Sequence, residues 1–314
     1  MDLRNALVFA WLLFMMSACA KLPIDPALPQ IQVHNQADSV TFAVIGDFGN
    51  DGQNEADVAA MVKSWNPEFV VTTGDNNYPT GSIATIYNNI GKHYCDFIYN
   101  PDAPADLQCK GKAFTDKQNR FFPVPGNHDN YSLPALQPYL DYFTLPGDER
   151  NYDFSWGPAH FFTLNTGKFG QLACCDSPEA KWATDALAQS TKPFKFMIFH
   201  HPPFSTGSHG NNTKMQWPFS AMGVDVVMCG HDHIYSRINA KQNPYPVYVI
   251  AGNSGNPNLY GCGSSILDTN RFDVVCDDKN WGAVKVKVSA TKAVFEYYTV
   301  AQQAFPTDVF IITK

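Results

Sequence analysis

The chain has 314 residues, of which 45% are hydrophobic and 14% aromatic, and its formal net charge is -7. This composition is typical of a soluble globular protein with a sizeable core, and it excludes a largely disordered chain. The acidic balance, without any block of Lys or Arg, argues against a nucleic-acid-binding surface. The length admits one large domain or two ordinary ones, and we find no internal repeat or low-complexity segment.

The N-terminal segment has the pattern of an export signal. Arg4 precedes an apolar run over residues 6–16, and the small residues Ser17-Ala18-Cys19-Ala20 follow it. The run is too short to span a bilayer, and no other segment is long and apolar enough to do so. Two processing routes fit: cleavage at the A-x-A site, or cleavage before Cys19 at an imperfect bacterial lipobox, which would make Cys19 a lipid anchor.

We favour simple export, to the periplasm or the medium. We therefore predict a signal peptide over residues 1–20, a Pro-rich linker over residues 21–39 and a single folded domain over residues 40–314. The sequence offers no convincing boundary inside that domain.

Export permits disulfide bonds among the seven cysteines that follow Cys19. Cys229 lies inside a buried apolar run and is expected to be a free thiol. Cys95 with Cys109, and Cys262 with Cys276, would each close an irregular loop. The adjacent Cys174 and Cys175 can pair with each other or with more distant partners, and spacing alone does not fix the connectivity. None has the repeated C-x-x-C spacing of a zinc site, so we expect structural roles.

Short apolar runs bounded by glycine or proline predict buried strands at residues 41–45, 69–73, 121–124, 194–199, 226–229, 247–250, 283–288 and 293–300. Helical spacing predicts helices over residues 53–65 and 178–189, the second with Ser177 as its N-cap. Alternation around Gly157-Pro158 predicts a hairpin over residues 152–166. Residues 79–120 have no regular pattern, and we predict an irregular lobe inserted beside the site.

Five of these strands end in polar turns. In chain order the turns are Gly46-Asp47-Phe48-Gly49, Gly74-Asp75-Asn76-Asn77-Tyr78, Gly126-Asn127-His128-Asp129, His200-His201-Pro202 and Gly230-His231-Asp232-His233. Open α/β sheets place their sites beyond the carboxyl ends of the strands. Asp, Asn, His and Tyr supply oxygen and imidazole ligands for metal ions. A two-metal centre holds its ions about 3.5–4 Å apart through a shared carboxylate, for which Asp75 is the best placed.

In order and content, the five turns resemble the five motif blocks of the calcineurin-like metallophosphoesterases. More narrowly, they resemble the purple acid phosphatases of the tartrate-resistant acid phosphatase type. Many metallophosphoesterases carry a His two residues after the first Asp, where this chain has Gly49, and this chain has Tyr78, which the purple enzymes use to bind ferric iron. The resemblance implies a four-layer α/β/β/α sandwich, with two mixed sheets face to face and helices outside.

Carried over residue by residue, the resemblance implies two metal sites. Fe(III) would be bound by Asp47, Tyr78, His233 and the shared Asp75. A second, divalent ion (Fe, Zn or Mn) would be bound by Asp75, Asn127, His200 and His231.

The resemblance also implies roles for the other imidazoles of these turns. His128 and His209 would donate protons or bind phosphate, and His201 would lie outside the ligand set or simply pack. Asp129 and Asp232 could each orient a neighbouring imidazole or accept backbone hydrogen bonds.

The implied activity is that of an exported acid phosphatase, which hydrolyses small phosphomonoesters with a metal-activated hydroxide as the nucleophile. Three anionic ligands beside a trivalent and a divalent ion leave a charge of about +2, which suits a phosphate anion. One alternative is a phosphodiesterase or nucleotide hydrolase on the same centre, with residues 79–120 expected to decide between the two. The other is a surface binding protein without turnover, which the intact ligand set disfavours. We expect a monomer without a nucleic-acid partner.

Overall fold

The computed structural model describes residues 38–167, 177–241, 246–263 and 272–314. The predicted signal peptide, most of the linker, the lipid anchor at Cys19 and the pairing of Cys174 and Cys175 lie outside the described residues. Among the described residues, no helix is long and apolar enough to cross a membrane.

Two mixed β-sheets form the framework of the domain. The first contains, in spatial order, β13 (Asp308–Thr313), β12 (Lys292–Thr299), β11 (Gly282–Ser289), β1 (Ser39–Ile45), β2 (Phe69–Thr72) and β3 (Phe121–Phe122). The second contains β10 (Phe272–Asp277), β8 (Tyr235–Ala240), β9 (Val247–Ala251), β7 (Val226–Cys229), β6 (Phe194–Phe199), β5 (Ala159–Leu164) and β4 (Tyr152–Trp156). Pairing is parallel along β1–β2–β3 and along β5–β6–β7–β9, and antiparallel elsewhere.

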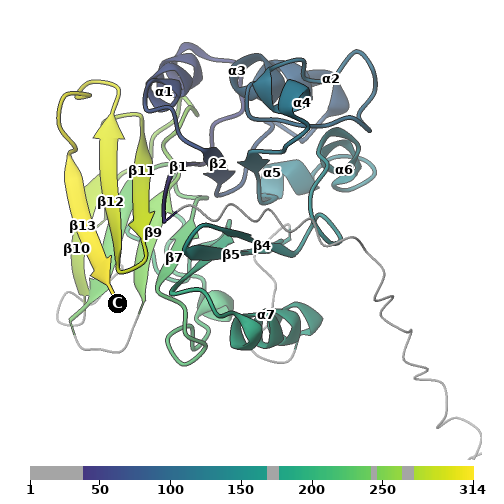
Figure 1. Cartoon of the computed structure of the whole chain (residues 1–314). Coiled ribbons are helices and arrows are strands. Elements are labelled where there is room, and N and C mark those ends of the chain that lie inside the picture. The colour runs from purple at the N-terminus through teal and green to yellow at the C-terminus, as the bar shows by residue number, and fades with distance from the viewer. Residues whose placement is uncertain (1–37, 168–176, 242–245, 264–271) are drawn as a thin grey trace, which may run out of the picture. The chain divides into compact units, whose positions relative to one another are not determined.

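The alternation of side chains along the strands generates the layers. On β6, Phe196 belongs to the core shared by the two sheets, whereas Met197 belongs to the core under helix α7 (Pro178–Gln189). In the shared core, Phe42 of β1 packs edge-on against Phe161 of β5, with ring centroids 5.0 Å apart. Helix α1 (Gln53–Ser64) buries Val58, Met61 and Val62 in the same core cluster as the first sheet, on the other side from α7 (Figure 1). The α/β/β/α sandwich is confirmed.

The prediction of an irregular lobe over residues 79–120 was wrong in detail. The segment contains the short helices α2 (Ile83–Ile86), α3 (Lys92–Tyr94) and α4 (Lys112–Asp116), and a π-helical turn η1 (Tyr87–Gly91). Each is too short to produce a helical periodicity that the sequence could reveal. The disulfides Cys95–Cys109 and Cys262–Cys276 form as expected, and Cys229 is buried with a free thiol.

Other elements were missed or shorter than predicted. Strand β3 ends at Phe122, since Pro123 and Pro125 cannot donate to a ladder. Strands β8, β10 and β13 were not predicted. Strands β8 and β10 lack the continuous apolar run that marks the central strands, whereas β13 contains the run Val309-Phe310-Ile311-Ile312 and fits the criterion used for the others. The unpredicted short helices that remain are α5 (Asn127–Asn130), α6 (Gln137–Tyr142) and the 3-10 turn η2 (Thr213–Met215).

Candidate metal centre

The polar turns of both sheets meet at the carboxyl ends of their parallel strands. Asp47 follows β1, Asp75 follows β2 and His231 follows β7, and their φ angles are 51°, 51° and 73°. A non-glycine residue pays a conformational cost in this left-handed region, and such strain concentrates at functional sites. Gly126, before Asn127, must lack a side chain because a Cβ atom there would lie 2.1 Å from Oδ1 of Asp75. The backbone of these turns is therefore constrained in a way that fixes the positions of their polar side chains.

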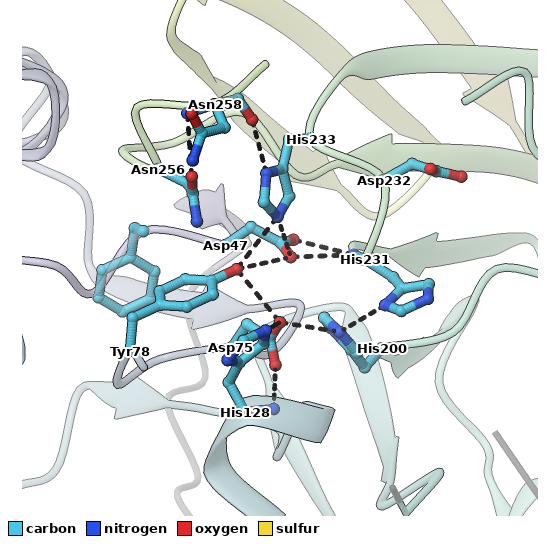
Figure 2. A network of polar contacts seen from close by, with 12 residues as sticks. Asp47, Asp75, Tyr78, His128, His200, His231, Asp232, His233, Asn256 and Asn258 are labelled. Atoms are coloured by element: carbon cyan, nitrogen blue, oxygen red, sulfur yellow. Dashed lines mark hydrogen bonds and ion pairs between the residues drawn. The ribbon is translucent and has the colours of Figure 1, made fainter. Parts of the chain in front are cut away.

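The first cluster gathers around the hydroxyl of Tyr78. Its Oη atom lies 3.3 Å from Oδ1 of Asp47, 3.1 Å from Oδ2 of Asp75 and 3.2 Å from Nε2 of His233 (Figure 2). Nδ1 of His233 donates to the carbonyl of Asn258 at 2.7 Å, so Nε2 presents a lone pair to the cluster. Four side chains with oxygen or nitrogen lone pairs therefore converge on one point. Such a donor set fits a cation.

The second cluster gathers around Nε2 of His200. This atom lies 3.3 Å from Oδ2 of Asp75, 3.0 Å from Oδ1 of Asn127 and 3.2 Å from Nδ1 of His231. Nδ1 of His200 donates to the carbonyl of Thr73 at 2.9 Å, which again leaves the lone pair of Nε2 for the cluster.

Tyr131 fixes the orientation of the amide in this second cluster. Asn127 donates from Nδ2 to Oη of Tyr131 at 3.2 Å, and its oxygen is thereby turned towards His200. Because Oδ2 of Asp75 belongs to both clusters, Asp75 is the carboxylate that two cations could share.

Burial sets the charge states of these groups. Burial raises the pKa of Asp47 well above its usual value, against the opposing charge of His200. Burial, followed by the charges of Asp75 and Asp47, likewise raises the pKa of Tyr78. Two crowded acids thus resist ionisation unless positive charge is supplied. Burial lowers the pKa of His233 to about 4, which keeps its imidazole neutral and able to bind a metal.

His200 behaves differently from His233, since it faces the carboxylates directly. Burial acts to lower its pKa, but the charges of Asp75 and then Asp47 outweigh burial and raise the pKa to about 9. A proton on Nε2 of His200 therefore occupies the place that a cation would take.

Asp129 and Asp232 were each expected either to orient an imidazole or to accept backbone hydrogen bonds, and the two residues differ in this respect. Asp129 accepts hydrogen bonds from the backbone N–H groups of Asn76 and Gly126 at 3.1 and 2.8 Å, so it ties two of the turns together. Oδ1 of Asp232 accepts from the backbone of His209 and lies 2.9 Å from its Nδ1, so it orients that imidazole.

A cavity of about 580 Å³ adjoins the second cluster. Its wall includes four imidazoles, those of His128, His201, His209 and His231, and the side chain of Lys214. In the described part of the chain, no Asp or Glu lines this cavity. Its wall therefore favours an anion. Residues 79–120, which we expected to shape the substrate site, do not line it. Instead, Asn89 from that segment donates to the carbonyl of Tyr78 at 2.8 Å and supports the turn.

The cavity contains both predicted proton donors. His128, on α5, donates from Nδ1 to the carbonyl of Pro79 at 2.6 Å, and its Nε2 lies 4.0 Å from Oδ2 of Asp75. His209 is held by Asp232, and its ring centroid lies 4.1 Å from that of His231.

The structure leaves no room for a side chain at position 49, where this chain has a glycine. A Cβ atom at Gly49 would lie 1.7 Å from the carbonyl oxygen of Asn76. The backbone N–H of Tyr78 also donates to the carbonyl of Gly49 at 2.7 Å. The turn that presents Tyr78 therefore fills the space that a side chain at position 49 would need.

Sequence reasoning missed several residues that support the site. The side chain of Asn256 acts on the Tyr78 hydroxyl and opposes the rise of its pKa, and Asn258, Thr73 and Tyr131 orient predicted ligands. The turn Gly252-Asn253-Ser254-Gly255-Asn256 directly follows β9 and has the same character as the five turns used for the prediction. It could have been found by the same criterion, whereas the contacts of Thr73 and Tyr131 carry no local signal.

Comparisons with known proteins identify the family of this chain. Residues 40–235, more than half of the chain, match the calcineurin-like phosphoesterase family. Purple acid phosphatase 4 of Arabidopsis thaliana is 26% identical over 268 residues, which cover 76% of this chain and 75% of the relative. The solved purple acid phosphatase PPD1 of yellow lupin (Lupinus luteus) has a TM-score of 0.68 at 13% identity, over 88% of this chain and 54% of that one.

A second solved structure shares the fold. GAP50, described as the anchor in the inner membrane complex of Plasmodium, has a TM-score of 0.62 at 16% identity, over 88% of this chain and 89% of that one. The present chain spans about half of the yellow lupin chain and most of GAP50. With its fold, its paired clusters and its match over residues 40–235, this chain belongs to the calcineurin-like phosphoesterase family, and its curated relatives include purple acid phosphatases.

Proposed function

We propose that the protein is a metal-dependent phosphoric monoester hydrolase, an acid phosphatase with two metal ions of different charge. The ligands of Fe(III) would be Asp47, Asp75, Tyr78 and His233. Those of a divalent Fe, Zn or Mn ion would be Asp75, Asn127, His200 and His231. The observation that carries the proposal is the convergence of these seven side chains into two acceptor-rich clusters that share Asp75.

When bound, the two cations would lower the pKa of a water molecule and offset the negative charge of the phosphoryl oxygens. The chain itself contributes the ligand geometry, the cavity wall and the proton donors. Because no carboxylate among the described residues lines the cavity, a phosphate dianion meets no repulsion outside the ligand clusters.

The leaving alkoxide needs a proton, and two imidazoles of the cavity can supply it. Nδ1 of His128 is engaged with the carbonyl of Pro79, so the proton available for transfer is the one on Nε2 of the protonated ring. Nδ1 of His209 is likewise engaged, by the carboxylate of Asp232, so Nε2 is the nitrogen available for proton transfer.

A substrate panel tests the proposal. The metal-loaded protein should hydrolyse an aryl phosphate monoester at acid pH, with a much lower kcat/KM for the matching diester and for nucleotides. Asn127→Ala should abolish most of this activity, whereas His160→Phe, a histidine that does not line the cavity, should preserve it. Preference for the diester would favour the phosphodiesterase alternative. Bound metal without any turnover would favour a binding protein.

We also propose that the chain is exported and acts on a small phosphorylated molecule as a monomer. The N-terminal pattern of residues 1–20 and the two disulfides support export. Cell fractionation, together with the mass of the mature N-terminus, would distinguish free export from a lipid anchor at Cys19.

A further inference from the structure

Three imidazoles crowd the second cluster, although the proposed ligand set uses only two of them. His200, His201 and His231 each place a ring nitrogen within 4.8 Å of the others. His201 is buried, with 4% of its surface exposed, and its ring also lines the cavity. Position alone would therefore allow His201 to be an additional metal ligand or a group that contacts the substrate.

The hydrogen bonds of the rings distinguish these roles. Nδ1 of His200 faces the carbonyl of Thr73, and Nδ1 of His233 faces the carbonyl of Asn258. A carbonyl oxygen can only accept, so Nδ1 carries the proton in both rings. The opposite nitrogen, Nε2, then has the lone pair that a metal requires.

His201 has a different partner. Its Nδ1 lies 2.7 Å from the hydroxyl oxygen of Thr166, which is a completely buried residue. Among the described residues, the Thr166 hydroxyl has no other hydrogen-bond partner. A buried hydroxyl that left its proton unbonded would lose its solvation without compensation. Thr166 must therefore donate to Nδ1 of His201, and the ring must carry its own proton on Nε2.

Nε2–H of His201 then has no acceptor in the described part of the chain, although it belongs to a ring of the cavity wall. The ring centroid lies 4.4 Å from that of His231, so the free donor is beside the second cluster. A protonated nitrogen cannot bind a metal, but it can donate to an anionic oxygen.

We propose that His201 donates a hydrogen bond from Nε2 to a phosphoryl oxygen of the substrate, and that Thr166 is the positioning residue that holds this tautomer. The inference rests on the proposed function, since it names a further contact of the same substrate. It assigns His201 to the substrate and leaves the metal sites with the seven ligands already described.

Three variants test the assignment in the metal-loaded protein. His201→Phe removes the hydrogen-bond donor and keeps an aromatic ring. Thr166→Val removes the hydroxyl and keeps the shape of the side chain, whereas Thr166→Ser keeps the hydroxyl. Affinity for inorganic phosphate, measured by calorimetry, should fall about 10-fold to 100-fold in His201→Phe, as expected for the loss of a hydrogen bond to a charged group. It should fall less in Thr166→Val and stay within about twofold of the wild type in Thr166→Ser. KM for the monoester should rise in parallel, and both metal ions should remain bound.

Two results would overturn the inference. Loss of one metal ion per chain from His201→Phe would make His201 a ligand, and unchanged phosphate affinity in both His201→Phe and Thr166→Val would make it a packing residue. Thr166→Val changes so little volume that it remains informative if His201→Phe does not fold. A wild-type protein that binds neither metal nor phosphate would contradict the proposed function itself, which separates the two failures.

Discussion

Oη of Tyr78 lies 3.2 Å from Nε2 of His233, although 155 residues separate them in the chain. Tyr78 comes from a turn of the first sheet, and His233 comes from a turn of the second. The contact exists only because the two sheets pack face to face, with the carboxyl ends of the parallel strands of both sheets on the same side of the sandwich. The candidate metal centre is thus a product of the sandwich and of no single motif.

Replacement of Tyr78 by Phe should remove the colour of the iron-loaded protein. A phenolate bound to Fe(III) absorbs visible light, so the wild-type protein should be violet or pink and Tyr78→Phe should be colourless. Visible spectra with iron content measured on the same samples check this. Tyr99→Phe, which alters a tyrosine packed against Phe114, is the control and should retain the band. Persistence of the band in Tyr78→Phe would show that another residue binds the ferric ion.

Replacement of Tyr131 by Phe should weaken the second site and leave the first intact. The Tyr131 hydroxyl holds the amide of Asn127, and loss of a hydrogen bond that orients a ligand lowers metal affinity about 10-fold to 100-fold. Competition with a chelator should therefore strip the divalent ion more readily, while the ferric absorption band stays unchanged. Equal retention of the divalent ion by variant and wild type would show that Asn127 needs no such support.

Replacement of Asp232 by Asn should lower kcat through His209. The carboxylate holds the backbone and the ring of His209, and a misoriented general acid costs about 100-fold or more. Because Asp232 lies between His231 and His233, metal content must be measured alongside kcat. In a His209→Ala background, Asp232→Asn should cause little further loss. A full additional loss in that background would mean that Asp232 acts independently of His209.

Replacement of Glu55 by Gln should flatten the dependence of stability on pH. Burial raises the pKa of Glu55 from 4.5 to about 9, and Oε2 accepts hydrogen bonds from the backbone of Asn50 and Asp51. Between these two values the folded chain keeps a proton that the unfolded chain has lost. The free energy of unfolding therefore falls as pH rises, by at most about 1.4 kcal/mol per pH unit from this group.

Urea unfolding of the wild type and Glu55→Gln across that pH range measures the effect. Glu179→Gln, at the start of α7, is the matched control and should follow the wild type. If Glu55→Gln kept the wild-type slope, the carboxyl group would be ionised in the folded chain.

The sequence revealed the strand-end turns because each is a local pattern: an apolar run is followed by a metal-binding side chain, with a glycine between them in four of the five turns. Asp47 and Asp75 could be placed at one sheet edge on that basis, since parallel strands bring their carboxyl ends together. Their meeting with His231, which follows a strand of the second sheet, was implied only by the family resemblance. The four-layer arrangement came from the family resemblance. Strand β13 carries the apolar run Val309-Phe310-Ile311-Ile312 and could have been predicted by the same criterion, although the structure leaves its residues partly or fully exposed at a sheet edge.

The supporting contacts could not be predicted, because they join distant residues across packed layers. Thr166 lies 35 residues from His201 in sequence, and only the fold brings the hydroxyl to the ring. The same holds for Asn256, which comes to lie beside Tyr78 only through the packing of the turn after β9. Residues 79–120 do not line the cavity, and Asn89 of that segment supports the Tyr78 turn. Their influence on the choice between monoesters and diesters stays a prediction.

The central claim is that two cations lie side by side across Asp75. Crystals of the iron-loaded protein, measured at the iron absorption edge, test it most directly. We expect two anomalous peaks about 3.5 Å apart. One should lie among Asp47, Tyr78 and His233, and the other among Asn127, His200 and His231. If the second site holds zinc or manganese, its peak should appear at the absorption edge of that metal. A single metal ion per chain in the fully loaded crystals, or peaks remote from Asp75, would contradict the claim of a two-metal centre.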